Sequence, residues 1–152
     1  MNVTELLREN GNEIVAEAVN AIQRAHLHHY ELADPGPVRQ RLQRLFELTL
    51  ECLESGSAEP MVRYVEKIAS ERFFTGFSLR EVQTAFNLLE ESIWNQILDK
   101  MQVDDFASAV TTVNAPLRVG KDEVARVYFS LVSKRKVPSL DLKTDFKRME
   151  NS

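Results

Sequence analysis

The chain has 152 residues, of which 43% are apolar and 28% are charged, as in an ordinary globular domain rather than a disordered segment. The single cysteine excludes an intrachain disulfide framework. The net charge of −4 disfavours nucleic-acid binding, because contacts to phosphate depend on positive charge. We therefore expect one domain with a buried core and no nucleic-acid partner.

The N-terminus shows no targeting segment. Residues 1–5 read MNVTE, without the basic and apolar regions of a secretory signal. No apolar run approaches the roughly 20 residues that a membrane span needs. We expect a cytoplasmic protein without a membrane partner.

Two helices are predicted in the first third of the chain. Apolar residues at helical spacing predict the first over residues 3–30, and Asn10-Gly11-Asn12 is a candidate break near its start. Residues 33–37 read ADPGP, which is typical of a loop. The second helix is predicted over residues 38–54.

A glycine and a capping box separate the third and fourth predicted helices. The third covers residues 61–76 and stops at Gly76, a residue type common just past helix ends. Ser78 and Glu81 match the capping box, in which each side chain accepts a backbone N–H of the other residue. The fourth helix is predicted from this box over residues 78–97.

The fifth predicted helix is long, and its apolar stripe begins at Phe106. Pro116 and Gly120 interrupt the segment, but the stripe keeps its register on both sides. Because a proline removes a backbone hydrogen bond, the sequence predicts one helix kinked at Pro116. The fold class is all-α, a bundle of about five helices within residues 1–136. Residues 137–152 are expected to form a tail, either a short amphipathic helix or a disordered segment.

Three histidines lie near the end of the first predicted helix. His26 and His29 share a helix face at a spacing that suits one metal ion. The glutamates that a diiron bundle needs three residues before each histidine are missing. We favour solvated histidines that complement the helix dipole. The prediction is no metal and no cofactor, with His26 and His29 as the weak metal-ligand candidates.

No arrangement of catalytic groups is evident, and we expect a protein that is not an enzyme. Cys52 lies in an apolar run and is interpreted as a buried thiol. Glu90 borders the apolar stripe of the fourth helix, with Phe86 and Trp94 one turn away on either side. It is interpreted as a charge at the rim of the core or paired with an arginine. The alternative is that Glu90 makes a polar contact in a ligand pocket or in a dimer interface.

Aromatic residues gather around the third and fourth predicted helices. Aromatic residues at helical spacing usually pack in a core, and the alternative is a ligand pocket. The candidate ligand-binding residues are Arg72, Phe73, Phe77, Phe86, Glu90 and Trp94. A small-molecule or haem-binding helical protein that uses the cluster over residues 73–86 is therefore the alternative function. Phe129 lies off the inner stripe of the last helix and would suit a partner or a second subunit.

The residues around Gly76 carry a family resemblance. The pattern is an arginine, then a turn of glycine, aromatic, serine and leucine, then an acidic residue and apolar residues in the next helix: Arg72, Gly76-Phe77-Ser78-Leu79, Glu81-Val82, Ala85 and Leu88-Leu89. This pattern resembles the RsbRD N-terminal-like family of helical sensory domains. These domains stand at the N-terminus of bacterial stress-signalling co-antagonists, some histidine kinases and related transcription regulators. The resemblance is densest over residues 65–97 and extends over most of the chain.

The resemblance implies a non-enzymatic bacterial input domain that passes a signal to an output protein. The chain ends shortly after its last long helix, so we expect no attached output domain. It would then act through a separate kinase, STAS protein or transcription regulator, or be a fragment of a longer protein. We also expect a homodimer through the last helices. Glu90 departs from the family pattern, because a basic residue is expected there in relatives.

Overall fold

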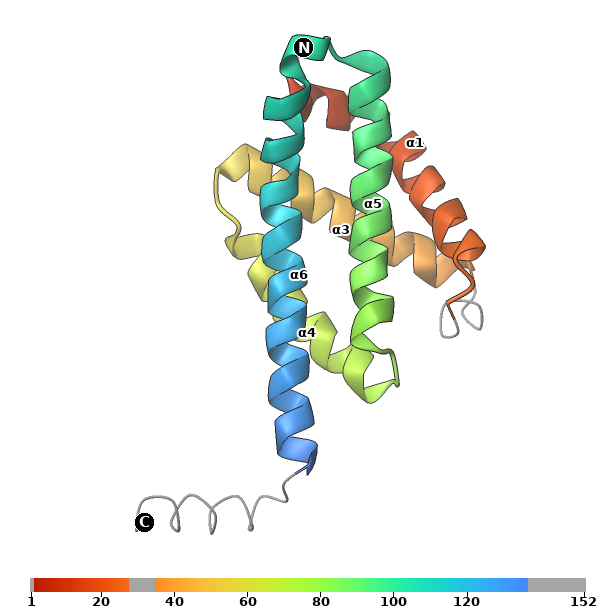
Figure 1. Ribbon diagram of the computed structural model, residues 1–152, viewed down its shortest axis with the longest axis vertical. Helices are drawn as coiled ribbons and strands as arrows, with labels where there is room; N and C mark the ends of the chain where they lie inside the picture. Colours follow the sequence, from red (N-terminus) through yellow and green to blue (C-terminus); the bar gives the residue numbers. More distant parts are fainter. Residues whose placement is uncertain (1, 28–34, 137–152) are drawn as a thin grey trace.

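Every element in the described part of the chain is a helix, as the sequence predicts (Figure 1). The computed structural model describes residues 2–27 and 35–136. The elements are α1 (Val3–Arg24), α3 (Pro35–Ser55), α4 (Glu59–Phe74), α5 (Leu79–Lys100), the 3-10 turn η1 (Val103–Asp105) and α6 (Phe106–Lys136). This arrangement confirms the predicted all-α bundle of five helices.

The bundle is built around α5 and α6, which lie side by side in Figure 1. α1 packs on α5, α4 packs on α6, and α3 contacts both α1 and α4. Apolar side chains at three- and four-residue steps face one shared core, and Phe86, Leu89 and Leu117 are fully buried in it. Burial of these apolar faces stabilises the helices more than intrinsic propensity does.

α1 ends earlier than predicted. Its last residue is Arg24, and His26 has a φ of 51°, in the left-handed region that stops a right-handed helix. The prediction of a helix to residue 30 is therefore wrong for residues 25–27. Residues 28–30 lie outside the described residues.

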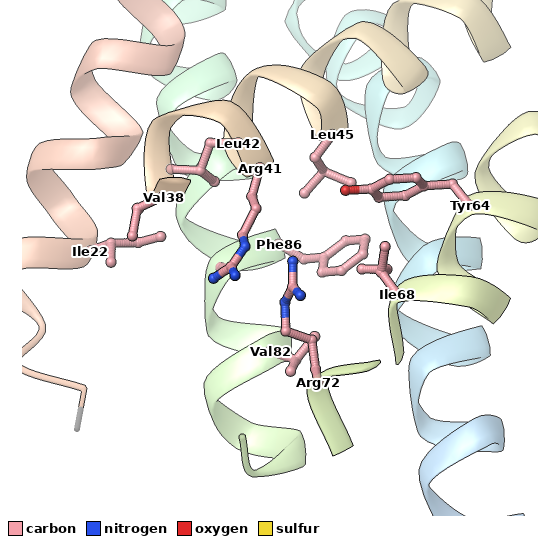
Figure 2. Close-up of a pocket in the computed structure, with 11 residues that line it drawn as sticks. Ile22, Val38, Arg41, Leu42, Leu45, Tyr64, Ile68, Arg72, Val82 and Phe86 are labelled. Carbon is pink, nitrogen blue, oxygen red and sulfur yellow. The ribbon is translucent and has the colours of Figure 1, made fainter. Parts of the chain in front are cut away.

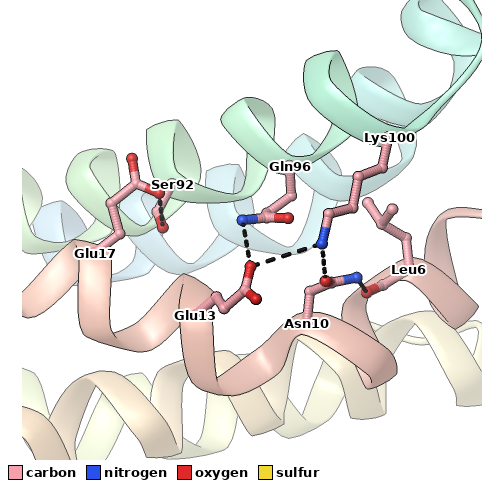
Figure 3. A network of polar contacts seen from close by, with 7 residues as sticks. All are labelled: Leu6, Asn10, Glu13, Glu17, Ser92, Gln96 and Lys100. Carbon is pink, nitrogen blue, oxygen red and sulfur yellow. Dashed lines mark hydrogen bonds and ion pairs between the residues drawn. The ribbon is translucent and has the colours of Figure 1, made fainter.

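The candidate break near the start of α1 is confirmed at Asn10, whose φ of −117° and ψ of 16° are not helical. Its side-chain amide donates to the carbonyl oxygen of Leu6 at 2.8 Å, and Lys100 of α5 donates to its amide oxygen (Figure 3). Lys100 Nζ also lies 3.6 Å from the carboxylate of Glu13, to which Gln96 donates at 3.2 Å. These contacts give the polar side chains of the irregular turn hydrogen-bond and ion-pair partners, and they hold the turn against α5.

α6 is one continuous helix of 31 residues, as predicted. Pro116 lies inside it, and the structure does not show the predicted kink. Gly120 is buried where α6 packs closely on its neighbours. A Cβ atom at this position would lie 2.6 Å from Cε1 of Phe86 and 3.2 Å from Cγ of Met61. Gly120 therefore permits a close approach of side chains rather than ending the helix.

The five described helices lie within the domain predicted over residues 1–136. The tail predicted over residues 137–152 lies outside the described residues. In the part of the chain that the structure describes, no helix combines the length and the apolarity that a membrane span requires.

Candidate functional site

The turn between α4 and α5 fixes the position of the site. Gly76 has a φ of 94°, which residues with a side chain rarely adopt. The backbone N–H of Phe77 donates to the carbonyl oxygen of Arg72 at 2.9 Å, and that of Gly76 donates to Phe73 at 3.1 Å. This pair of hydrogen bonds is a Schellman motif, which satisfies the last carbonyl groups of α4. The chain then turns inward, and Phe77 is buried.

The predicted capping box at the start of α5 is confirmed. The backbone N–H of Glu81 donates to Oγ of Ser78 at 3.1 Å, and the N–H of Ser78 donates to a carboxylate oxygen of Glu81 at 2.9 Å. Two N–H groups at the helix end are thereby satisfied, which fixes where α5 begins. Val82 and Phe86 then face a cavity beside α3 and α4.

A small cavity lies between α3, α4 and α5, with Ile22 of α1 at its edge (Figure 2). Its volume is about 30 Å³, room for about one water molecule. Most of its walls are apolar, and Figure 2 shows two guanidinium groups directed into the space. We call it the arginine cavity, and its main residues are Arg41, Leu45, Tyr64, Arg72 and Phe86.

Two arginines line the arginine cavity. Arg72 is only 9% exposed. The Cζ atoms of Arg72 and Arg41 lie 5.8 and 5.9 Å from the centroid of the Phe77 ring, which is the geometry of a cation–π contact. No aspartate or glutamate is among the described residues that line the cavity. Burial raises the pKa of the Tyr64 phenol, and the charges of nearby arginines, with Arg72 foremost, act to lower it.

A larger hollow lies where the turn between α4 and α5 faces α6. Its volume is about 380 Å³. At one side, the phenolic O–H of Tyr128 donates to the carbonyl oxygen of Phe77 at 2.8 Å. At the other side, Phe129 is 66% exposed. We call this hollow the terminal groove, and its main residues are Phe73, Phe77, Leu79, Tyr128, Phe129 and Val132.

Four of the six predicted ligand-binding residues line these two hollows. Arg72 and Phe86 line the arginine cavity, and Phe73 and Phe77 line the terminal groove. The predicted aromatic cluster is therefore divided between two sites. Phe77 joins them, because its ring contacts the arginines while its residue also lines the groove.

The other two predicted residues face α6 instead. Glu90 is buried, and its carboxylate lies 3.5 Å from Nζ of Lys121. The interpretation of Glu90 as a paired charge is confirmed, but its partner is a lysine rather than the expected arginine. The indole N–H of Trp94 donates to Oδ1 of Asn114 at 2.9 Å. Glu90 and Trp94 thus join α5 to α6, and their role in ligand binding stays a prediction.

The weak metal-ligand candidates do not form a described site. His26 is exposed, and His29 lies outside the described residues. Within residues 2–27 and 35–136, no group of three His, Cys, Asp or Glu side chains could hold a metal ion. The prediction that Cys52 is a buried thiol is confirmed, since it is 4% exposed and burial raises its pKa.

The sequence interpretation missed Arg41 and Tyr64. Arg41 lies three residues after Val38 and four before Leu45, on the apolar stripe of α3. A basic residue inside an apolar stripe was the available signal. Tyr64 gave no comparable signal, because a tyrosine suits a half-buried helix position anywhere.

The structure is an all-α domain in which the arginine cavity and the terminal groove are two of the hollows, and its described part holds no metal centre. A family model described as the RsbT co-antagonist protein rsbRD N-terminal domain matches residues 12–129. The chain therefore belongs to this family, as the resemblance predicted, and membership indicates a stress-signalling regulatory domain. No curated protein and no solved structure matches the chain significantly.

Proposed function

We propose that the chain is a non-enzymatic regulatory input domain of bacterial signal transduction that acts in the cytoplasm through contacts with other proteins. Its partners are a second copy of the chain and a separate output protein of the kinase, STAS or transcription-regulator class. Family membership supports the regulatory role. The terminal groove supports the role in protein contacts.

The observation that carries the proposal is the exposure of aromatic side chains at the terminal groove. Phe129 of α6 is 66% exposed, and Phe74 at the end of α4 is 70% exposed. Aromatic residues are enriched in protein interfaces. Burying a phenylalanine fully on association contributes roughly 1.5–3 kcal/mol. Phe129 lines the groove of about 380 Å³, and the ring of Phe74 packs edge-on against Phe73, which also lines it, so the two exposed rings suit a complementary protein surface.

α6 is well placed for a two-fold contact. Figure 1 shows its last turns running past the turn between α4 and α5. These turns present Phe129 and Val132 at the groove. In a two-fold dimer, Phe129 of each subunit would enter the groove of the other, so that one surface serves both subunits.

The alternative of haem binding has little support from the geometry. The arginine cavity, at about 30 Å³, is far smaller than a porphyrin requires, and no described histidine lines it. A smaller ligand remains compatible with the cavity and with a regulatory role.

Light scattering coupled to size-exclusion chromatography tests the proposed dimer. We expect a dimer for the wild-type chain and a monomer for Phe129→Glu, because the charge would be buried without a partner. Leu98→Glu is the matched control, since Leu98 is also apolar and exposed, at 57%, but lies on α5 away from the groove. A Phe129→Glu variant that folds normally and stays dimeric would contradict the proposed contact.

A further inference from the structure

The outer side of the α5–α6 pair carries exposed apolar side chains that do not belong to the terminal groove. Leu98 of α5 is 57% exposed, and Val103 of the turn η1 is 75% exposed. Figure 1 shows α5 and α6 in front of α3, so no described helix covers this side of the pair. Single exposed apolar residues are common on protein surfaces, whereas a contiguous patch marks an interaction site.

The register of α5 against α6 makes these side chains part of one patch. The two helices are joined by the short turn η1 and run antiparallel. The indole N–H of Trp94 donates to Oδ1 of Asn114 at 2.9 Å, which places these two residues opposite each other. Because residues four apart share one side of a helix, Leu98 lies opposite Val110 one turn further along. Val110 and the tryptophan are partly buried. We call the surface of Trp94, Leu98, Val103 and Val110 the outer face.

Exposed carboxylates surround the outer face. Glu91 precedes the exposed leucine by two turns on the same side of α5, Asp99 follows that leucine in the chain, and Asp104 follows the exposed valine. None of these three carboxylates forms an ion pair with a described residue. Arg118 is exposed on the same side of α6, but it follows Val110 by about 12 Å along the helix. An apolar centre with a negative rim favours an apolar partner surface that is flanked by positive charge.

We propose that the outer face binds an amphipathic helix of a separate protein, whose apolar stripe is flanked by lysine or arginine. A helix fits between two antiparallel helices, because its side-chain ridges enter their grooves, and its apolar residues at three- and four-residue steps act as anchors. The stripe would cover Leu98 and Val110, and the basic flanks would meet Glu91 and Asp99.

A second copy of the chain suits the outer face less well. In a two-fold contact the same surface meets itself, so the negative rims of the two copies would face each other. The assignment of the bound helix to the output protein rests on the proposed function, whereas the binding of a basic amphipathic helix does not.

The fluorescence of Trp94 tests the site directly, because this residue is the single tryptophan of the chain and lies in the outer face. The probe is a synthetic amphipathic peptide of leucine and lysine, titrated into the full chain at constant ionic strength. The comparison peptide has glutamate in place of every lysine. We expect a saturable change with the lysine peptide and binding of the glutamate peptide that is weaker by about tenfold or more. No saturable change, or equal binding of both peptides, would overturn the proposal.

Three variants at exposed positions locate the binding. Leu98→Gln is expected to weaken binding of the lysine peptide about tenfold, because an apolar contact is lost. Asp99→Asn is expected to weaken it about threefold, as is typical of one exposed charge pair. Glu9→Gln removes an exposed carboxylate of α1 and should bind as the wild type does. Unchanged affinity of the Leu98→Gln variant would overturn the proposal.

This proposal and the proposed dimer fail separately. Phe129→Glu changes the terminal groove and should bind the lysine peptide as the wild type does. Loss of binding in that variant, with unchanged binding in Leu98→Gln, would assign the peptide to the terminal groove and overturn the proposal. Light scattering should show the same oligomeric state for Leu98→Gln as for the wild type. A dimer that becomes a monomer on this substitution would show that a second copy covers the outer face, which would also overturn the proposal.

Discussion

The phenolic hydroxyl group of Tyr128 donates a buried hydrogen bond of 2.8 Å to the carbonyl oxygen of Phe77. This bond joins the last part of α6 to the turn between α4 and α5, two segments far apart in the sequence. The ring of Phe73 packs edge-on against Tyr128 with centroids 5.3 Å apart, which reinforces the contact. The turn that carries Phe77, which lies between the arginine cavity and the terminal groove, is therefore held to α6 by side-chain and backbone contacts.

Tyr128→Phe tests the strength of this connection. We expect the free energy of unfolding to fall by about 1–2 kcal/mol, because the carbonyl group of Phe77 is left buried without its donor. Urea unfolding followed by circular dichroism measures the change. Tyr64→Phe removes a hydroxyl group for which no hydrogen bond is described, and it should change stability by less than about 0.5 kcal/mol. Equal effects of the two substitutions would contradict the role given to Tyr128.

Gly120→Ala tests the close packing of α6. A Cβ atom there would lie 2.6 Å from the ring of Phe86, which is 2% exposed and has little room to move. Overpacking costs about 1–3 kcal/mol, and the better helix propensity of alanine returns only about 1 kcal/mol. We expect a net loss of up to about 2 kcal/mol in urea unfolding. Gly36→Ala is the control, because nothing lies within 4 Å of a Cβ atom at Gly36. A Gly120→Ala variant as stable as the wild type would show that the helices separate easily.

Cys52 should resist thiol reagents. It is 4% exposed, and burial raises its pKa above the ordinary value of 9.0, so that the unreactive thiol form dominates at neutral pH. We expect a colorimetric disulfide reagent to react with the folded chain far more slowly than with glutathione, and to react rapidly after unfolding in urea. Since the folded pKa is raised, the stability linked to this group is present below pH 9 and is lost as the pH rises further. Rapid reaction of the folded chain at pH 7 would contradict the burial of the thiol.

Pro116→Ala tests whether the proline loosens α6. The substitution supplies a backbone N–H that can donate to the carbonyl group of Thr112, and it removes the clash that a proline ring makes with that group. We expect slower amide hydrogen exchange over residues 112–120. Unchanged exchange over these residues would show that Pro116 does not loosen α6.

The features that could be predicted from the sequence depend on residues close together in the chain. Gly76 ends α4, and Ser78 and Glu81 begin α5, because the turn and the capping box involve only neighbouring backbone groups. The break at Asn10 could be predicted for the same reason. The register of the apolar stripe likewise predicted one continuous α6 despite Pro116.

The features that were missed depend on how helices pack. Arg41 and Tyr64 come from two helices, and Arg41 meets Tyr64 and the predicted Arg72 only when α3 packs on α4. An arginine was expected as the partner of Glu90, but Glu90 lies on the side of α5 that faces α6, where it pairs with Lys121. Spacing along one helix defines a face, but the neighbour of that face is set by the tertiary fold.

A native mass spectrum of the full chain tests the central claim, that this domain acts through association with other protein chains, most directly. We predict a mass of two chains at micromolar concentration, and a mass of one chain for Phe129→Glu under the same conditions. The Leu98→Glu control should give the dimer mass. A wild-type chain that remains a monomer at every concentration would contradict the account.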